Sequence, residues 1–253
     1  MRLVWSPETA SEAYIDTVKA VSMHTLKPKL NPPLLSYLYM YTNYIYGCFF
    51  IFMQCQNFKE SSIAELLSTM AAGWNAKLIV QAWSLGAPIV TSIGLAIAAR
   101  HTRGRHVCIV PDEHSRLEYT NAMREHADVA PTPEVVVGEA EATMAGLVGV
   151  DFLVVDCNRG DFARVLRFAK LGQRGAVLAC KNARERNAVS EFRWHGVLQS
   201  GTRVVRTVFL PVEKGLDIAH VGSTTGGSSR WGRPGRWIRH IDARSGEEHL
   251  FRG

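Results

Sequence analysis

Polar side chains that could bind a ligand follow the predicted strands of this chain. They fall in five segments, residues 83–88, 110–114, 138–142, 156–161 and 181–186. None of the five contains a GxxxxGK[ST] phosphate loop or a GxGxxG turn, and the chain has no GxSxG nucleophile elbow and no HExxH zinc motif. The residues therefore predict a ligand site at the strand ends without specifying a reaction.

The first of these segments is poor in glycine. Gly86 is the only glycine between residues 82 and 88. A turn that holds a nucleotide against its backbone normally needs several glycines, because side chains keep the ligand at a distance. Trp83 could stack on a ligand, or it could fill the space where a ligand would lie, and the sequence leaves both interpretations open.

Histidine and cysteine offer no metal or disulfide pattern. The nine histidines are scattered, and none stands at metal-ligand spacing from a cysteine or a carboxylate. Five cysteines form no CxxC pair, and an odd number fits a reduced intracellular chain better than a disulfide framework. The first residues carry no apolar run before the first acids, which argues against a secretory signal. We expect a cytoplasmic or nuclear location.

The elements that must position these segments alternate between strand and helix. Helices are expected over residues 7–19, 62–72, 89–100, 115–128, 139–147 and 161–171. Strands are expected over 77–83, 106–110, 134–137, 151–156 and 175–180, followed by an antiparallel hairpin of 203–211 and 215–221. This order predicts an α/β fold with a doubly wound, mostly parallel Rossmann-like sheet, whose ligands lie beyond the carboxyl ends of the strands.

Composition fits one large domain with appendages. The chain has 253 residues, of which 47% are hydrophobic and 21% charged, which excludes a wholly disordered protein, a collagen-like repeat and a long coiled coil. We divide it into an N-terminal helix (1–20), an anomalous aromatic insertion (21–54), the Rossmann-like domain (55–222) and a basic tail (223–253).

The insertion differs sharply from its surroundings. Residues 21–54 contain no Asp, Glu or Ala, and eight of the 21 uncharged residues 34–54 are aromatic. Three interpretations are open. The stretch is just long enough to cross a bilayer as a helix, although its polar residues and dispersed tyrosines weaken that signal. It could be an aromatic insertion packed on the domain. It could also be a retained intron translated in frame, because residues 21–22 can be encoded as a plant-type splice donor (GTAAGT) and 49–54 as a T-rich tract ending in the acceptor ATGCAG. We expect no membrane contact unless 21–54 is a true anchor.

The tail is rich in arginine and tryptophan. Residues 230–253 hold six arginines and three acids, and a Gly/Ser-rich run precedes them. Arginine interleaved with tryptophan could bind nucleic acid, but no nucleic-acid-binding motif accompanies it, so a basic surface tail is the favoured interpretation.

Six sequence blocks follow one another in a familiar order: AELLSTMAAGWNAKLIVQAW, RHVCIVPDE, GEAEATMAGL, VDFLVVDCNRGDF, GAVLACKNA and RTVFLPVEKGLDIAHVG. Over about residues 60–222 they resemble S-adenosylmethionine-dependent methyltransferases of the small-molecule O-methyltransferase type. Together with the opening LVWSPETASEAYIDTVKA, they look like a family of uncharacterised plant proteins, with a domain of unknown function, assigned to that superfamily. The resemblance implies a methyltransferase-type Rossmann fold and S-adenosylmethionine as the cofactor.

Carried over residue by residue, the resemblance implies a site that is only partly retained. Asp156 matches the aspartate that binds a divalent metal near the methionine end of the cofactor, and Gly138 and Glu139 match a Gly-Asp-Ala element beside the adenine, with Glu replacing Asp. The cofactor contacts expected on this basis are Trp83, Ser84, Gly86, Asp112, Gly138, Glu139 and Asp156.

Other landmarks of the family are missing. The acid that would hold the ribose hydroxyls is replaced by Val110, with Asp112 two residues later as a substitute. The Asp-Asn metal pair appears as Lys181-Asn182, and a lysine ammonium beside Asp156 would repel a divalent cation or pair with the carboxylate. We therefore expect no metal and, at most, weak binding of S-adenosylmethionine.

Two functions are consistent with these residues. The favoured one is a methyltransferase-like protein that has lost metal-dependent catalysis and serves as a binding or regulatory module for an unknown protein or small molecule. The alternative is an active, metal-independent S-adenosylmethionine-dependent methyltransferase acting on an unknown substrate.

Overall fold

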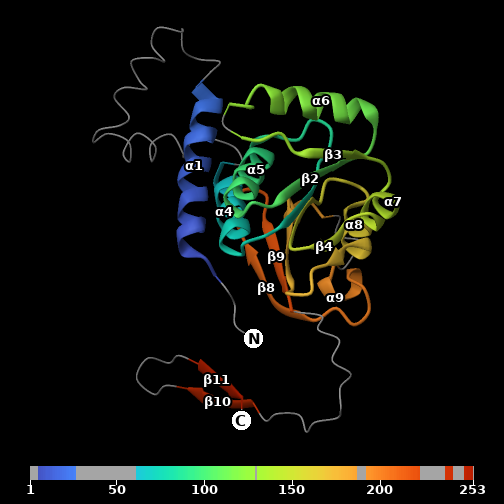
Figure 1. Cartoon of the computed structure of the whole chain (residues 1–253). Helices are drawn as coiled ribbons and strands as arrows, with labels where there is room; N and C mark the ends of the chain where they lie inside the picture. The colour runs from blue at the N-terminus through green and yellow to red at the C-terminus, as the bar shows by residue number, and fades with distance from the viewer. Residues whose placement is uncertain are drawn as a thin grey trace, which may run out of the picture.

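A seven-stranded sheet forms the centre of the molecule (Figure 1). The computed structural model describes residues 5–26, 61–128, 130–186, 192–222, 237–241 and 248–252. The strands of the main sheet are β1 (Leu78–Ala82), β2 (Arg105–Val110), β3 (Glu134–Val137), β5 (Phe152–Asp156), β7 (Ala176–Lys181), β8 (Val204–Leu210) and β9 (Leu216–Val221). Their order is β3-β2-β1-β5-β7-β9-β8. The first five run parallel, and β9 is antiparallel to both of its neighbours, which confirms the predicted fold class and the C-terminal hairpin.

Helices cover both faces of this sheet because its strands are apolar on both sides. One face carries α1 (Pro7–Leu26), α4 (Ser61–Gly73), α5 (Val90–Thr102) and α6 (Glu113–Arg124), and the other carries α7 (Ala140–Ala145), α8 (Phe162–Phe168) and α9 (Trp194–Val197). Successive residues of β1 show the alternation. Val80 belongs to a core cluster with Met144 of α7, whereas Ile79 packs with Leu67 of α4 and Leu95 of α5.

Small residues bring the helices of the first face close together. At Gly94 of α5, an added Cβ would lie 2.9 Å from the backbone oxygen of Ala64 in α4 and 3.3 Å from Cγ2 of Thr17 in α1. The Thr17 hydroxyl also donates a buried hydrogen bond of 2.8 Å to Ser68 of α4. The small residue at position 94 therefore allows α5 to pack closely against α4 and α1.

Several elements differ from the expectations drawn from the sequence. Helix α1 continues to Leu26, beyond the predicted end at residue 19, and its Val21 is buried against Ala64 and Val90. The helix predicted over 161–171 ends at Phe168, because β6 (Lys170–Leu171) pairs with the unpredicted strand β4 (Val148–Val150).

The remaining differences concern short or terminal elements. Helix α9 and the 3-10 turn η1 (Ala183–Glu185) were not expected. No element was predicted within the basic tail, where β10 (Trp237–Ile241) and β11 (Glu248–Arg252) form an antiparallel pair. Most of the predicted insertion, residues 27–54, lies outside the described residues. Among the helices that the structure describes, none is both long and apolar enough to cross a membrane.

Candidate ligand site at the strand ends

The candidate site lies where the winding of the sheet reverses. Strand β1 stands between β2 and β5. The chain leaves β1 toward α5 on one face and leaves β5 toward α8 on the other, so the carboxyl ends of β1 and β5 mark the switch point at which α/β proteins bind ligands. The cavity at this place, lined by residues 81–84, 87–88, 154–156 and 181, has a volume of only about 10 Å³. That is roughly the space of one water molecule.

Trp83 lines the site. Its side chain is 3% exposed, its indole Nε1 donates a hydrogen bond of 3.2 Å to the carbonyl of Ala87 in the same turn, and its ring meets Tyr119 of α6 edge to face at 5.4 Å. The indole is therefore fixed by a hydrogen bond within its own turn and by an aromatic contact with α6. Of the two interpretations left open by the sequence, this geometry favours the one in which Trp83 occupies ligand space.

Arg159 occupies the neighbouring space. It lies in the turn after β5 and is 7% exposed, and its Nη1 donates hydrogen bonds of 3.0 Å to the carbonyls of both Trp83 and Ile109. Its Nε and Nη2 atoms bind the two carboxylate oxygens of Asp161. The guanidinium thus connects the ends of β1 and β2 to the turn after β5. Its N–H groups form these hydrogen bonds with other groups of the protein.

Asp156, at the end of β5, accepts hydrogen bonds from two neighbouring donors. One carboxylate oxygen accepts hydrogen bonds from the backbone N–H of Asn158 at 2.9 Å and from Nδ2 of Asn182 at 2.8 Å. The nearby Lys181 is buried, and its ammonium donates to the Thr91 hydroxyl at 2.9 Å. Asn182 therefore presents a donor, and Lys181 a cation, where a metal would need oxygen ligands.

Asp112 acts as a helix cap. Its Oδ1 accepts a hydrogen bond of 2.7 Å from the backbone N–H of Ser115 at the start of α6. This bond lowers the pKa of the fully exposed Asp112 carboxyl. One oxygen of the side chain that was predicted to replace the acid missing at Val110 is therefore engaged at the helix start.

The remaining predicted residues are dispersed around the site. The backbone N–H of Gly86 donates to Glu118 of α6 at 3.2 Å, and the N–H of Gly138 donates to the carbonyl of Val110 at 3.0 Å. Glu139 is exposed and its carboxylate lies 3.4 Å from Arg164 Nη1. Ser84 lines the small cavity, and its hydroxyl is buried without a hydrogen-bond partner.

These residues do not fit S-adenosylmethionine in the arrangement that the structure shows. The cofactor is a large polar molecule, whereas the space at the switch point is that of one water, and the Arg159 guanidinium and one Asp156 oxygen are engaged with groups of the protein. A divalent metal does not fit either, because Asn182 Nδ2 donates to Asp156 and the cross-strand neighbour of Asp156 is a buried lysine instead of an oxygen ligand. Within the described residues no group of three or more His, Cys, Asp or Glu side chains could hold a metal ion.

Sheet order, helices on both faces and the position of the switch point define a methyltransferase-type Rossmann-like fold. A methyltransferase from Geobacter sulfurreducens shares it with 22% sequence identity and a TM-score of 0.50, over 79% of this chain and 95% of that one. A putative caffeoyl-CoA O-methyltransferase from Staphylococcus aureus has 15% identity and a TM-score of 0.49, over 75% and 98%. An SAH-bound Podospora anserina methyltransferase has 14% identity and a TM-score of 0.48, over 82% and 96%.

The chain belongs to the DUF1442 family, described as a protein of unknown function, which matches residues 1–29 and 48–253. Residues 30–47, in the middle of the predicted insertion, fall outside that match. Among curated proteins, none matches the chain.

Sequence reasoning missed the residue that dominates the site. Arg159 lies in the segment 156–161, for which the sequence predicted a ligand contact only at the first residue, Asp156. The available signal was an arginine three residues after the end of an all-apolar strand and two residues before an acid, Asp161. A guanidinium with a carboxylate this close in sequence can be buried as a pair.

Proposed function

We propose that this protein is a methyltransferase-type Rossmann protein that does not transfer methyl groups and acts as a binding or regulatory module. The observation that supports the proposal is the double hydrogen bond of Arg159 Nη1 to the carbonyls of Trp83 and Ile109. A ligand that approached the ends of β1 and β2 would have to displace a buried guanidinium and remove the donor of the Trp83 carbonyl, while the Ile109 carbonyl would keep its bond from the Trp83 N–H. Such a loss is costly in a protein interior.

The surroundings of Asp156 support the same proposal. Catalysis of the metal-dependent kind needs several oxygen ligands around one cation, and this chain presents the Asn182 amide and the Lys181 ammonium instead. The partner of the module, a protein or a small molecule, and its cytoplasmic or nuclear location remain the predictions made from the sequence.

S-adenosylmethionine is the first ligand to test, because similar structures include methyltransferases and one of these is SAH-bound. Isothermal calorimetry with S-adenosylmethionine and with S-adenosylhomocysteine, each with and without magnesium, should show a dissociation constant no tighter than about 100 µM, since each lost charged contact weakens binding by roughly tenfold or more.

Arg159→Met tests the role of Arg159 in this result, because methionine keeps the apolar part of the side chain and removes the guanidinium. If Arg159 occupies ligand space, the variant should bind S-adenosylmethionine as well as the parent or better. Arg164→Met, at an exposed arginine of α8, is the matched control. Micromolar binding by the parent chain that is lost in Arg159→Met would overturn the proposal and support the active, metal-independent methyltransferase.

A further inference from the structure

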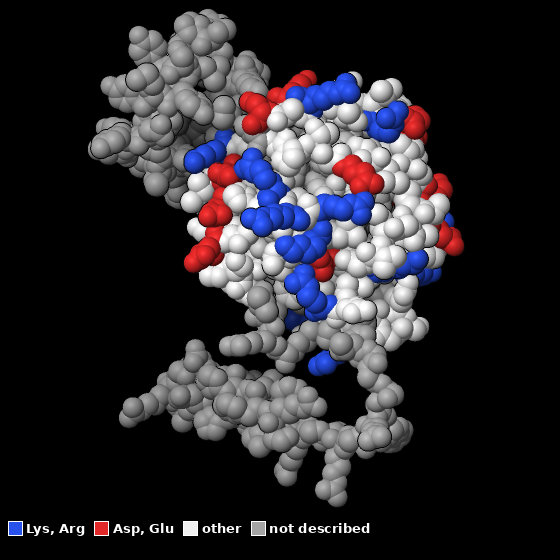
Figure 2. All heavy atoms as spheres, in the orientation of Figure 1, with Lys and Arg blue, Asp and Glu red and all other residues white. Residues whose placement is uncertain are grey.

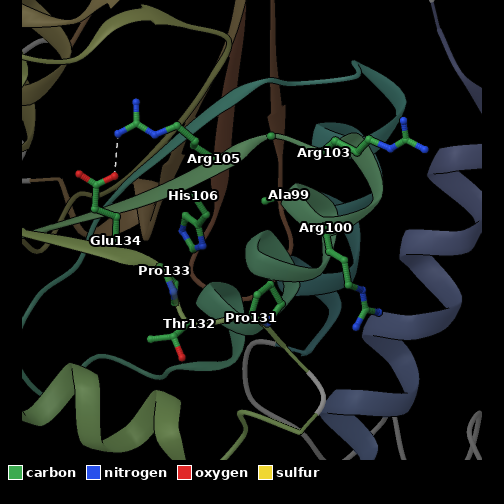
Figure 3. A pocket seen from close by; sticks show the side chains of 10 residues that line it. Ala99, Arg100, Arg103, Arg105, His106, Pro131, Thr132, Pro133 and Glu134 are labelled. Carbon is green, nitrogen blue, oxygen red and sulfur yellow. Dashed lines mark hydrogen bonds and ion pairs between the residues drawn. The ribbon is translucent and has the colours of Figure 1, made fainter.

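A second cavity lies at the amino ends of the strands, opposite the site at their carboxyl ends. It has a volume of about 370 Å³ and is formed by the last turn of α5, the first residues of β2 and the segment 131–134 that leads into β3 (Figure 3). Its volume is typical of small-molecule sites. The two ends of β2 are about 17 Å apart at 3.3 Å per residue, so this cavity is separate from the strand-end site.

A buried histidine lines this cavity without a hydrogen-bond partner. His106 is 6% exposed, and neither its Nδ1 nor its Nε2 is hydrogen-bonded. Figure 3 shows its ring directed toward the segment that holds Pro131 and Pro133. Burial lowers the pKa of His106 to about 3, so the imidazole is neutral at neutral pH and offers one donor and one acceptor.

An unpartnered histidine on a core strand needs an explanation. Buried polar groups are nearly always paired, and leaving one unpaired destabilises the folded state. The neighbouring core positions of β2, Val107 and Cys108, are filled by apolar or weakly polar side chains. An apolar residue at position 106 would satisfy the fold equally well, so the imidazole points to a ligand.

Arginines frame the same cavity. In Figure 3, Arg105 stands on one side and Arg100 and Arg103 on the other. Arg105 pairs with Glu134 at 2.6 Å and Arg100 with Asp16 at 2.8 Å, but both pairs are largely exposed and such pairs are weak. Arg103 is exposed and forms no ion pair with any residue that the structure describes.

The surface around the cavity is basic. Figure 2 shows Lys and Arg side chains gathered over α5 and the neighbouring part of β2. Such a surface attracts anions from solution, and guanidinium groups bind phosphate in a bidentate geometry.

We propose that this cavity binds a small phosphorylated metabolite, with the phosphate held at the rim by Arg103 and its neighbouring arginines and with a polar group of the organic part hydrogen-bonded to His106. The volume of this open cavity fits a small molecule. Both ring nitrogens of His106 are covered by protein, so the ligand needs an organic part that extends beyond the phosphate and displaces neighbouring side chains to reach the imidazole. The inference stands on this cavity alone and is independent of the strand-end site.

Calorimetry and NMR of the full chain test the proposal with defined probes. The probes are ribose 5-phosphate and AMP, with ribose, adenosine and inorganic phosphate as controls. At least one phosphorylated probe should bind more tightly than its unphosphorylated counterpart and than inorganic phosphate. It should also shift the imidazole resonance that disappears in His106→Phe.

Single substitutions show whether the phosphorylated probe binds in this cavity. Arg103→Gln and His106→Phe should each weaken the phosphorylated probe about tenfold, the effect of losing one charged or well-placed hydrogen bond. Arg116→Gln, at an exposed arginine of α6 away from the cavity, should leave it unchanged. His106→Phe should stay folded, because the cavity beside position 106 leaves room for the larger phenyl ring.

Three outcomes would overturn the proposal. The first is the absence of binding by either phosphorylated probe. The second is equal binding of inorganic phosphate and of its esters, which would indicate a simple anion site. The third is equal weakening by Arg103→Gln and Arg116→Gln, which would indicate general attraction to a basic surface.

Discussion

Arg159 donates a 3.0 Å hydrogen bond to the backbone carbonyl of Trp83 across the carboxyl ends of the sheet. This bond connects the turns after β5 and β1, whose separation creates the ligand site of many α/β proteins. The same Nη1 reaches the carbonyl of Ile109 at the end of β2. One side chain therefore closes the switch point and holds three strand ends together.

Replacing Arg159 by alanine should destabilise the protein by about 3 kcal/mol, because the Trp83 carbonyl loses its donor, the Ile109 carbonyl loses one of its two donors and Asp161 loses its partner. Chemical denaturation followed by circular dichroism measures the free energy of unfolding. The matched control is Arg164→Ala, whose partner Glu139 is exposed, and its effect should stay within about 0.5 kcal/mol. Equal effects of the two substitutions would show that Arg159 does not hold the strand ends.

The order of strands and helices could be predicted from the sequence because it depends on patterns along the chain. The apolar run ending at Asp156 identified a strand buried on both faces, and the structure places β5 in the middle of the sheet. Strands β4 and β6 were missed because they have three and two residues. The pairing of such short segments depends on tertiary contacts that no local pattern encodes.

Gly94→Ala should destabilise the protein by about 1–2 kcal/mol despite the better helix propensity of alanine, because the new Cβ would press on the backbone of α4. That Cβ would lie 2.9 Å from the Ala64 oxygen. Gly196→Ala in α9 is the control, since a Cβ there meets nothing within 4 Å. Thermal unfolding of both variants measures the contrast. A stabilised Gly94→Ala variant would contradict the close packing of α5 on α4.

Deleting residues 30–47 should leave the free energy of unfolding unchanged within about 1 kcal/mol, because shortening the connection between two helices alters its closure entropy only slightly. These residues lie outside the family match. Denaturation of the full and shortened chains tests the expectation. Insolubility of the shortened chain alone would show that the segment contributes to the fold.

A longer deletion, of residues 21–54, tests whether the insertion extends beyond residues 30–47. It removes Val21, which is buried against Ala64 and Val90, and joins Ala20 to Cys55. The loss of the valine side chain should cost about 1 kcal/mol relative to the shorter deletion. Transcript sequencing across codons 21–54 tests the retained-intron hypothesis, and vesicle flotation of the full and shortened chains tests the membrane-anchor alternative.

The candidate site was less predictable than the fold, because its state depends on which side chains meet. The positions of Asp112 and Asp156 after their strands were read from the sequence. Their hydrogen bonds to Ser115 and Asn182 depend on local turn geometry and on a neighbouring strand. The histidine of β2 was likewise one of nine scattered histidines until the structure showed that it is buried and unpaired.

The buried, neutral state of His106 predicts a specific loss of stability in acid. Its pKa is about 3 in the folded protein, against an ordinary value of 6.5. As the pH falls below 6.5, the unfolded chain takes up a proton that the folded chain does not, so the folded state loses stability down to about pH 3. Relative to His106→Phe, the parent chain should lose about 2 kcal/mol between roughly pH 7 and pH 5.

The comparison with His106→Phe isolates the contribution of His106. The pKa of the half-buried His220 is also lowered, by burial and by Arg206, but His220 contributes equally to the pH dependence of both proteins. At about pH 7 the variant should be as stable as the parent or up to about 1 kcal/mol more stable, since it buries no unpaired nitrogen. Urea denaturation at a series of pH values gives both free energies. Parallel pH profiles for the two proteins would show that His106 has a proton-accepting partner in the folded state, and would remove the reason to place a ligand beside it.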